Sequence, residues 1–128
     1  MPLAATPEAV AGWNERVEAF CAAHGLADEL ALHLALVFEE MLINIVRHGN
    51  APGIEASLTL TAGELRGEVI DDGPAFDPLQ APPPDLDAAL DDRPIGGLGI
   101  HLLRSLTDEA RYERQDGRNR LIFVKRLP

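Results

Sequence analysis

The longest apolar stretch of the chain lies in a predicted helix over residues 29–48, about 30 Å long at 1.5 Å per residue. Asp28 is a suitable N-cap for this helix, and Gly49 and Pro52 follow it as termination signals. Because apolar residues cover most of its circumference, the helix must be packed on several sides. We therefore expect it to be the central helix of the domain.

One side of this helix carries a carboxylate, an amide and an imidazole, at Glu40, Asn44 and His48. A spacing of four residues places them along one side, with a drift of about 40° per step. Such groups are costly on an otherwise apolar helix unless something binds them. The helix alone leaves two explanations open, a solvated polar stripe and a ligand site. A metal site formed with His33 is a weaker alternative, since the chain contains no HExxH motif.

The other predicted elements follow from hydrophobic periodicity. Apolar residues at spacings of three and four predict helices, and alternation with period two predicts strands. In chain order they are an edge-strand fragment at 3–6, a helix at 8–24, strands at 54–61 and 64–70, a helix at 98–106, and strands at 110–115 and 121–126. Turns at 62–63 and 116–119 join the strands into hairpins. This order predicts an α+β fold, a two-layer sandwich of a mixed, mostly antiparallel sheet with helices on one face.

Residues 74–95 differ in composition from the rest of the chain, with six prolines in 74–94 and five aspartates. A proline-rich, charged segment of this length predicts a mobile loop, which is either a functional lid or a disordered excursion. We find no linker and no internal repeat elsewhere. Residues 1–128 are therefore expected to form one domain.

Charge and cysteine content exclude several classes of function. A net charge of −10 and a pI near 4.7 argue against binding to nucleic acid or to an anionic membrane surface. The single cysteine, Cys21, excludes an internal disulfide, and its apolar surroundings favour a buried structural thiol. The first residues lack the pattern of a signal peptide, and no apolar stretch is free enough of charge to span a membrane. We expect a cytoplasmic protein.

Two glycine-containing motifs are candidates for ligand contact. Gly96-Gly97-Leu98-Gly99 opens the last predicted helix, where backbone N–H groups can approach phosphates, although a flexible hinge is an equal alternative. Asp71-Asp72-Gly73 ends a strand, where an acidic side chain can accept a hydrogen bond from an exocyclic amine. A simple strand-ending turn explains the second motif as well. The Rossmann, P-loop and GxSxG patterns are missing from the chain.

Taken in this order, the motifs resemble the GHKL ATPase superfamily of gyrase-type and histidine-kinase-type ATP-binding domains. The N-box, E-x-x-x-N, corresponds to Glu40–Asn44, the D-x-G box to Asp71–Gly73, and the G-x-G box to Gly97–Gly99. Within the superfamily, the Phe76-Asp77-Pro78 tail and the blocks at 96–114 and 117–126 look most like the anti-sigma factor serine kinases. The resemblance covers about residues 8–127.

The resemblance implies a role for each matching residue. Glu40 would be the catalytic base, Asn44 would hold Mg²⁺, and Asp71 would read adenine, with Gly73 leaving room for the ring. Gly97 and Gly99 would wrap the phosphates of ATP, and 74–95 would be the lid. The remaining nucleotide-binding residues implied by the resemblance are His48, Phe76, Arg93, Leu98 and Asn119.

The implied function is an ATP- and Mg²⁺-dependent serine protein kinase. It would phosphorylate an anti-sigma-factor antagonist and sequester a sigma factor, with homodimerisation a further family expectation. Two alternatives are a non-catalytic ATP-gated binding switch and a stand-alone histidine-kinase-like ATP domain. The chain departs from the family in its short N-terminal strand and in offering Arg93, beside Pro94, as the only basic residue between Arg66 and Arg104.

Overall fold

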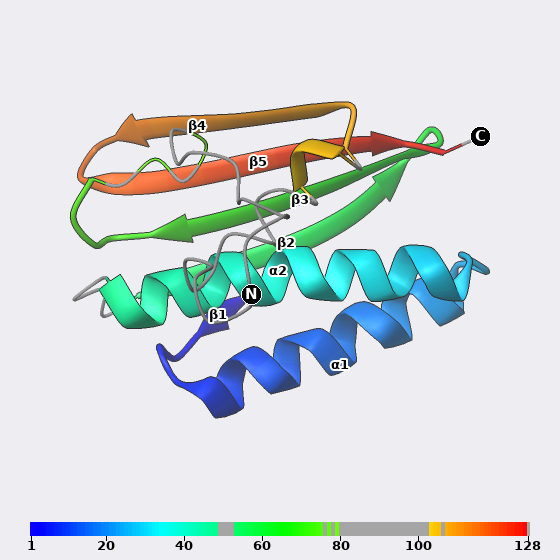
Figure 1. Cartoon of the computed structure of the whole chain (residues 1–128), viewed down its shortest axis with the longest axis horizontal. Helices are drawn as coiled ribbons and strands as arrows, with labels where there is room; N and C mark the ends of the chain where they lie inside the picture. Colours follow the sequence, from blue (N-terminus) through cyan, green and yellow to red (C-terminus); the bar gives the residue numbers. More distant parts are fainter. Residues whose placement is uncertain (49–52, 76, 78, 80–102, 106, 128) are drawn as a thin grey trace, which may run out of the picture.

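Two helices pack against one face of a five-stranded sheet in the computed structural model (Figure 1). The structure describes residues 1–48, 53–75, 77, 79, 103–105 and 107–127. In chain order the elements are β1 (Pro2–Leu3), α1 (Pro7–Ala23), α2 (Asp28–His48), β2 (Ile54–Thr61), β3 (Glu64–Asp71), β4 (Glu109–Gln115) and β5 (Arg118–Arg126). The predicted two-layer α+β fold is confirmed.

The sheet has the strand order β1-β2-β3-β5-β4, and every pairing among the described strands is antiparallel. The parallel component that the term "mixed" allowed for is therefore not found among these strands. β3 lies between β2 and β5 and is paired along its whole length. As the central strand, it carries its last residue, Asp71, to a sheet end that is lined by β5.

Local signals set most element boundaries within one or two residues of the prediction. The side chain of Thr6 caps α1 by accepting a hydrogen bond of 3.2 Å from the Ala9 N–H, and Gly25 leaves the helix with φ 65°. α2 begins at Asp28 itself, so the prediction that Asp28 is the N-cap was wrong by one residue. In the first turn, its carboxylate still interacts favourably with the helix dipole. The edge strand is β1 at residues 2–3, rather than 3–6.

The two hairpin turns are set by residues with positive φ. Ala62 and Gly63 join β2 to β3 with φ values of 51° and 79°, and Asp116 and Gly117 join β4 to β5 with 55° and 75°. Such pairs form the two-residue turns that match the twist of a hairpin. The predicted turn at 116–119 is therefore shorter than expected, and Asn119 lies within β5.

Three aromatic rings connect the two layers of the core. Phe38 of α2 makes edge-to-face contacts with Trp13 of α1 and with Phe123 of β5, each at 5.4 Å between ring centroids. Phe38 and Phe123 are completely buried. Phe123 lies directly over Gly67 of β3, where a side chain would collide with its ring. This stack fixes the position of α2 over the centre of the sheet.

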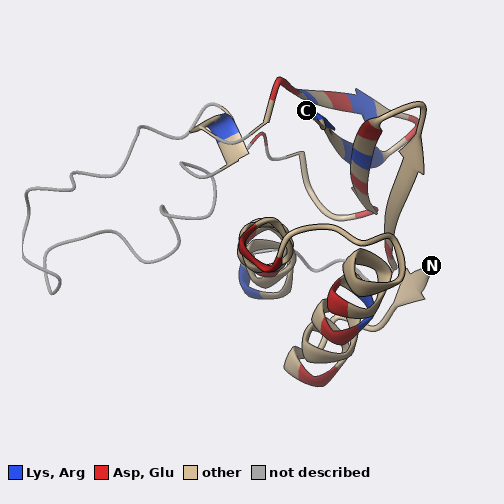
Figure 2. Ribbon diagram, turned by 90° about the vertical axis from the view of Figure 1, so that its right-hand side faces the viewer, with Lys and Arg blue, Asp and Glu red and all other residues tan. Residues whose placement is uncertain are grey.

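Among the described elements, both helices lie on one side of the sheet, and the strands carry many charged residues (Figure 2). Glu68 pairs with Arg120 at 2.8 Å and with Arg66 at 3.9 Å, and similar pairs continue along β4 and β5. Ile122 belongs to the same face as Glu68 and is only 2% exposed. The helix-covered face therefore contains the main core.

Candidate functional site

Glu40 of α2 is unusual because its charged side chain is partly buried. Its side chain is half-buried, and its Oε1 atom is buried without a hydrogen-bond partner among the described residues. Burial raises the pKa of the carboxyl group above its ordinary value of 4.5, the charge of Arg47 partly opposes this, and Glu39 adds to it. A buried carboxylate oxygen without a donor is a costly feature, so Glu40 is suited to a group that arrives from outside.

Asn44 lies one helical turn after Glu40 and is also half-buried. The drift of about 40° per four residues moves the stripe from the flank of α2 at Glu40 towards its core side. The buried residues Val37 and Met41 adjoin the stripe on that side. The stripe is thus not a fully solvated face. His48 is the last residue of α2, and its side chain lies outside the described residues.

A second polar site lies at the end of β3. Asp71 is 8% exposed, and its Oδ1 atom accepts a hydrogen bond of 2.9 Å from the Gly73 N–H. This bond closes a tight turn over Asp72 and leaves Gly73 buried beside the carboxylate. Both hydrogen bonds that the described residues donate to Asp71 go to Oδ1.

Asn119 of β5 holds this turn in place. Its amide nitrogen lies 3.0 Å from Asp71 Oδ1, 2.8 Å from the Pro74 carbonyl oxygen and 3.5 Å from that of Gly73. Register explains the contact, because Asn119 is the direct cross-strand partner of Asp71. The hydroxyl of Tyr112 donates to the Asn119 side-chain oxygen and so orients the amide. With Asp71 and Gly73, these two residues form what we call the β3-end site.

Arg114 adds a further contact that sequence reasoning missed. Its guanidinium donates a hydrogen bond of 2.7 Å to the Gly73 carbonyl oxygen. Arg114 is exposed, as a residue on a solvated face would be, and it makes this contact in addition. No role in the site was predicted for Tyr112. The period-two pattern of β4 could have identified both, since residues 112 and 114 lie on the same side of that strand.

Asp72 has a different partner from its neighbour. It is exposed, and its Oδ1 atom accepts a hydrogen bond of 3.0 Å from the Gly53 N–H, at the start of β2. Successive side chains of an extended chain point in opposite directions, so the two adjacent aspartates have different partners. Asp71 faces the buried site, and Asp72 bonds to Gly53, the residue that precedes β2.

Several predicted site residues cannot be compared with the structure. Phe76, Arg93, Gly97, Leu98 and Gly99 lie outside the described residues, as does most of the predicted lid at 74–95. Of the helix predicted at 98–106, residues 103–105 are described and are helical. The structure therefore describes two parts of the predicted site, the α2 stripe and the β3-end site.

Other candidates from the sequence have structural roles. Cys21 is buried, and burial raises the pKa of its thiol, as expected for an unreactive core cysteine. Trp13 belongs to the core. The described residues contain no cluster of three or more His, Cys, Asp or Glu side chains able to hold a metal ion. Within the same residues, no helix is long and apolar enough to cross a membrane.

An Mg²⁺ ion that is shared with phosphate groups needs few protein ligands. The side-chain oxygen of Asn44 is a hard ligand of the kind that Mg²⁺ prefers. One turn away, the Glu40 oxygen has no hydrogen-bond partner among the described residues and so leaves room for a polar group. The residues present therefore fit a magnesium–nucleotide complex.

Comparison with known proteins identifies the family of the fold. The model of the histidine kinase-like ATPase domain matches residues 3–125. The serine/threonine-protein kinase BtrW of Bordetella bronchiseptica is 42% identical over 99 residues, which are 74% of this chain and 70% of that protein.

Solved structures show the same fold. The RsbU and RsbW domains of Rv1364c from Mycobacterium tuberculosis match 99% of this chain, with a TM-score of 0.72 and 22% identity. The chain spans only 31% of that structure. The Erythrobacter litoralis blue-light activated histidine kinase EL346 matches 80% of this chain and 34% of its own, with a TM-score of 0.57 and 19% identity. The predicted resemblance is thus confirmed, and the chain belongs to the histidine kinase-like ATPase domain family.

Proposed function

We propose that this protein is an ATP-dependent serine protein kinase. The observation that carries the proposal is the buried, unpartnered carboxylate oxygen of Glu40. A general base must be able to reach the proton that it takes, and a pKa raised towards neutrality improves its basicity. Glu40 would accept the serine hydroxyl proton while the serine oxygen bonds to the terminal phosphorus of ATP. The bond from that phosphorus to the bridging oxygen breaks, and ADP leaves.

Asn44 would hold Mg²⁺ through its side-chain oxygen, one turn along α2 from the base. When bound, Mg²⁺ neutralises phosphate charge, which matters in a chain of net charge −10. His48, at the end of the same stripe, would lie towards the phosphates. This arrangement assigns the α2 stripe to the reacting end of the nucleotide.

The β3-end site would bind the adenine. Asp71 Oδ2 would accept a hydrogen bond from the exocyclic amine, and Gly73 would let the ring approach the backbone. Three residues hold the turn through hydrogen bonds: Asn119 bonds to Asp71, Tyr112 bonds to Asn119, and Arg114 bonds to the Gly73 carbonyl. We therefore assign them to positioning rather than to ligand contact. The glycines of the G-x-G box, Gly97 and Gly99, would bind the phosphates.

The substrate class rests on the relatives. A chain 42% identical over 99 residues is named a serine/threonine-protein kinase, and an RsbW domain shares the fold. On this basis and on the motifs, the acceptor is a serine of an anti-sigma-factor antagonist, and the second partner is a sigma factor. A non-catalytic switch would use the same ATP site, and only turnover separates the two functions.

The nucleotide site is tested by thermal shift with ATP and MgCl₂. ATP should raise the Tm of the wild-type protein, because it binds only the folded state. Asp71→Asn should abolish this rise while remaining folded, since the amide keeps the shape of the side chain. Asp72→Asn is the matched control and should retain the rise. If ATP does not raise the Tm of the wild type, the proposed function fails.

The catalytic role is tested by transfer of labelled phosphate from ATP to a purified antagonist protein that carries an acceptor serine. Glu40→Ala should keep the ATP-induced rise in Tm and lose at least about 100-fold in transfer rate, as removal of a general base does. Glu39→Ala, one residue away and exposed, should stay close to wild type. Unchanged transfer by Glu40→Ala shows that Glu40 is not the base. Absence of transfer by the wild type favours the switch.

A further inference from the structure

The first strand covers only the beginning of β2. Pro2 and Leu3 pair with Glu55 and Ile54, and the backbone of Met1 exchanges hydrogen bonds of 2.8 and 3.0 Å with Ala56. Among the described strands, none pairs with this edge of β2 over residues 57–61. Backbone groups alternate in direction along a strand. The N–H and C=O groups of Leu58 and Leu60 therefore point to the same open side as those of Ala56.

The two edges of the sheet, β4 on one side and the part of β2 beyond β1 on the other, differ in the residues that discourage further pairing. β4, at one edge, has the sequence EARYERQ, with four charged residues in seven. Charges of this kind protect an edge strand from association. The part of β2 that has no partner among the described strands on this side, residues 57–61, reads SLTLT and contains neither charge nor proline. This edge has the composition of a strand that accepts a partner.

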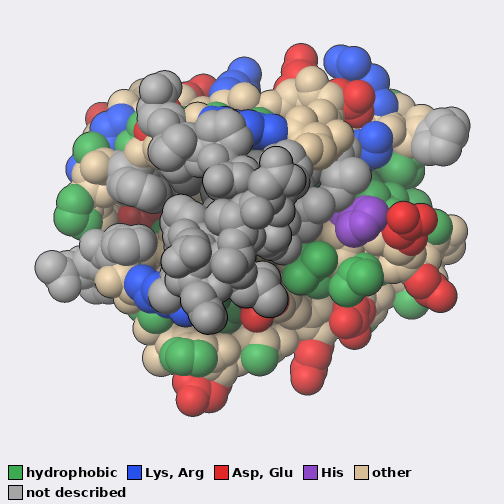
Figure 3. All heavy atoms as spheres, in the orientation of Figure 1, with side chains coloured by type: hydrophobic (Ala, Val, Ile, Leu, Met, Phe, Trp, Pro, Cys, Tyr) green, Lys and Arg blue, Asp and Glu red, His purple; other side chains and the backbone are tan. Residues whose placement is uncertain are grey.

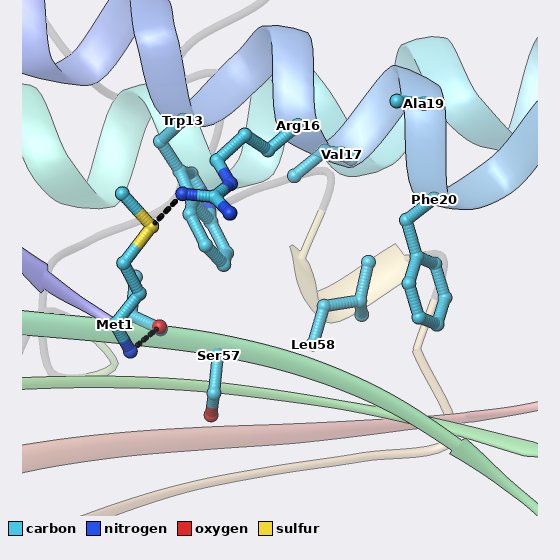
Figure 4. A pocket seen from close by; sticks show the side chains of 9 residues that line it. Met1, Trp13, Arg16, Val17, Ala19, Phe20, Ser57 and Leu58 are labelled. Carbon is cyan, nitrogen blue, oxygen red and sulfur yellow. Dashed lines mark hydrogen bonds between the residues drawn. The ribbon is translucent and has the colours of Figure 1, made fainter.

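A groove of about 510 Å³ lies between this edge and α1 (Figure 4). Trp13, Arg16 and Phe20 extend from α1 towards β2, and Ser57 and Leu58 line the opposite wall. The volume falls in the range of sites that take several side chains or a small ligand. Because its floor is a strand edge whose backbone groups have no partner among the described strands, the groove suits an extended chain better than a compact molecule.

The polar groups of the groove indicate the charge of its occupant. Arg16 is the only cation of α1, and no carboxylate lines the groove. Its described contact is a hydrogen bond of 2.7 Å to the Met1 sulfur, a weak acceptor. The indole nitrogen of Trp13 is buried without an acceptor among the described residues. On the face seen in Figure 3, most of the charged side chains over the helix layer are acidic. An acidic group in the groove would meet two cations, the Arg16 guanidinium and the N-terminal ammonium of Met1, which also lines the groove.

We propose that this groove binds an extended peptide segment of a partner protein, which adds to the sheet beside β2. The segment continues the line of Met1–Leu3 and pairs with the backbone of Leu58 and Leu60, over about 17 Å for five residues. It places an apolar side chain between Trp13 and Leu58 and an acidic side chain on Arg16. The inference does not depend on nucleotide binding.

The chain reports occupancy of this groove directly, because Trp13 is its single tryptophan. The probe is a blocked hexapeptide, acetyl-Thr-Leu-Thr-Phe-Thr-Asp-amide, titrated into the full chain while tryptophan emission is recorded. Saturable change in emission is expected. The same peptide with proline in place of its third residue, a threonine, should not bind, because proline removes a strand N–H donor. Replacing its aspartate by lysine should weaken binding about tenfold, a loss of about 1.4 kcal/mol.

Two variants test the geometry. Arg16→Glu should bind the lysine peptide better than the aspartate peptide, reversing the wild-type preference. Ala19→Phe narrows the groove and should abolish binding, whereas Ala22→Phe, outside the groove, should retain it. Circular dichroism and Tm confirm that each variant is folded. Binding of the proline peptide, or an unchanged preference in Arg16→Glu, overturns the proposal.

A second copy of the chain is the competing occupant. In that case tryptophan emission changes with protein concentration alone, sedimentation gives a dimer, and Ala19→Phe dissociates it. That result also overturns the peptide proposal. ATP-induced changes in Tm are measured in parallel. Because the nucleotide site uses other residues, loss of either function leaves the other interpretable.

Discussion

The amide nitrogen of Asn119 lies 3.0 Å from the buried carboxylate oxygen Oδ1 of Asp71. These residues are separated by 48 positions in the chain and face each other across β3 and β5. The same nitrogen contacts the carbonyl of Pro74, so one side chain holds both the carboxylate and the turn that follows it. The orientation of Asp71 therefore depends on the β4–β5 hairpin.

Removing this contact should destabilise the protein. Asn119→Ala leaves a buried carboxylate oxygen and a carbonyl with one donor fewer, which costs about 1–3 kcal/mol. Chemical denaturation measures the loss, and Gln115→Ala, on the exposed end of the same hairpin, is the control. If nucleotide binds here, ATP affinity should fall as well. A destabilisation no larger than that of the control would show that the contact contributes nothing.

Tyr112 should act through Asn119. Tyr112→Phe removes the hydroxyl that donates to the Asn119 side-chain oxygen, at an expected cost of about 0.5–1.5 kcal/mol. In a double-mutant cycle with Asn119→Ala, the two costs should not add, since both changes remove the same hydrogen bond. Strict additivity would contradict the proposed chain of contacts from Tyr112 to Asp71.

Glu40 should make stability depend on pH. Its folded-state pKa is raised, so the folded protein binds a proton at higher pH than the unfolded chain does. The contribution of Glu40 protonation to the free energy of unfolding is fully present below the pKa that Glu40 has in the unfolded chain. It is lost as the pH rises through the pKa that Glu40 has in the folded protein. Glu40→Gln should therefore raise the Tm at pH 7, by an amount that shrinks towards pH 4. Glu18→Gln, on the exposed face of α1, should show no such trend.

The same shift predicts the acid limb of the pH–rate profile for phosphate transfer. A base acts only when deprotonated, so the rate should increase as the pH rises through the raised pKa of Glu40. A limb at or below the ordinary value of 4.5 would contradict this assignment. The profile should be recorded at saturating ATP, so that changes in nucleotide affinity do not contribute.

Gly67 should not tolerate a side chain. A Cβ atom at this position would lie 2.1 Å from Cζ and 2.3 Å from Cε1 of Phe123, a fully buried ring. Overpacking of this kind costs about 1–3 kcal/mol, so Gly67→Ala should lower the free energy of unfolding by that amount. Gly12→Ala is the matched control. It has no neighbour within 4 Å and lies inside α1, where alanine should stabilise by about 0.5–1 kcal/mol.

Some features of the candidate site could be predicted from the sequence, and others could not. Glu40 and Asn44 share one helix, and a repeat of four residues places them on one side whatever packs around them. Arg114 is exposed, yet its side chain donates to the Gly73 carbonyl. Its position depends on the register of β4 against β5 and of β5 against β3, which are pairings between distant segments.

Asn119 shows how small differences in a turn change a role. The sequence alone placed it in the hairpin turn, but positive φ at Asp116 and Gly117 completes the turn in two residues. Asn119 consequently enters β5 opposite Asp71, and its amide becomes a buried donor. A single residue of register would have turned the side chain to the other face of the sheet.

The sequence by itself determined the central helix with its polar stripe, the two hairpins and the D-x-G turn, because periodicity and turn chemistry act over a few residues. Only the tertiary structure decided that one Glu40 oxygen is buried without a partner and that Asn119, Tyr112 and Arg114 hold the end of β3. Those features depend on which layers cover the helix and on strand register. Both are properties of contacts between segments far apart in the chain, which local patterns do not encode.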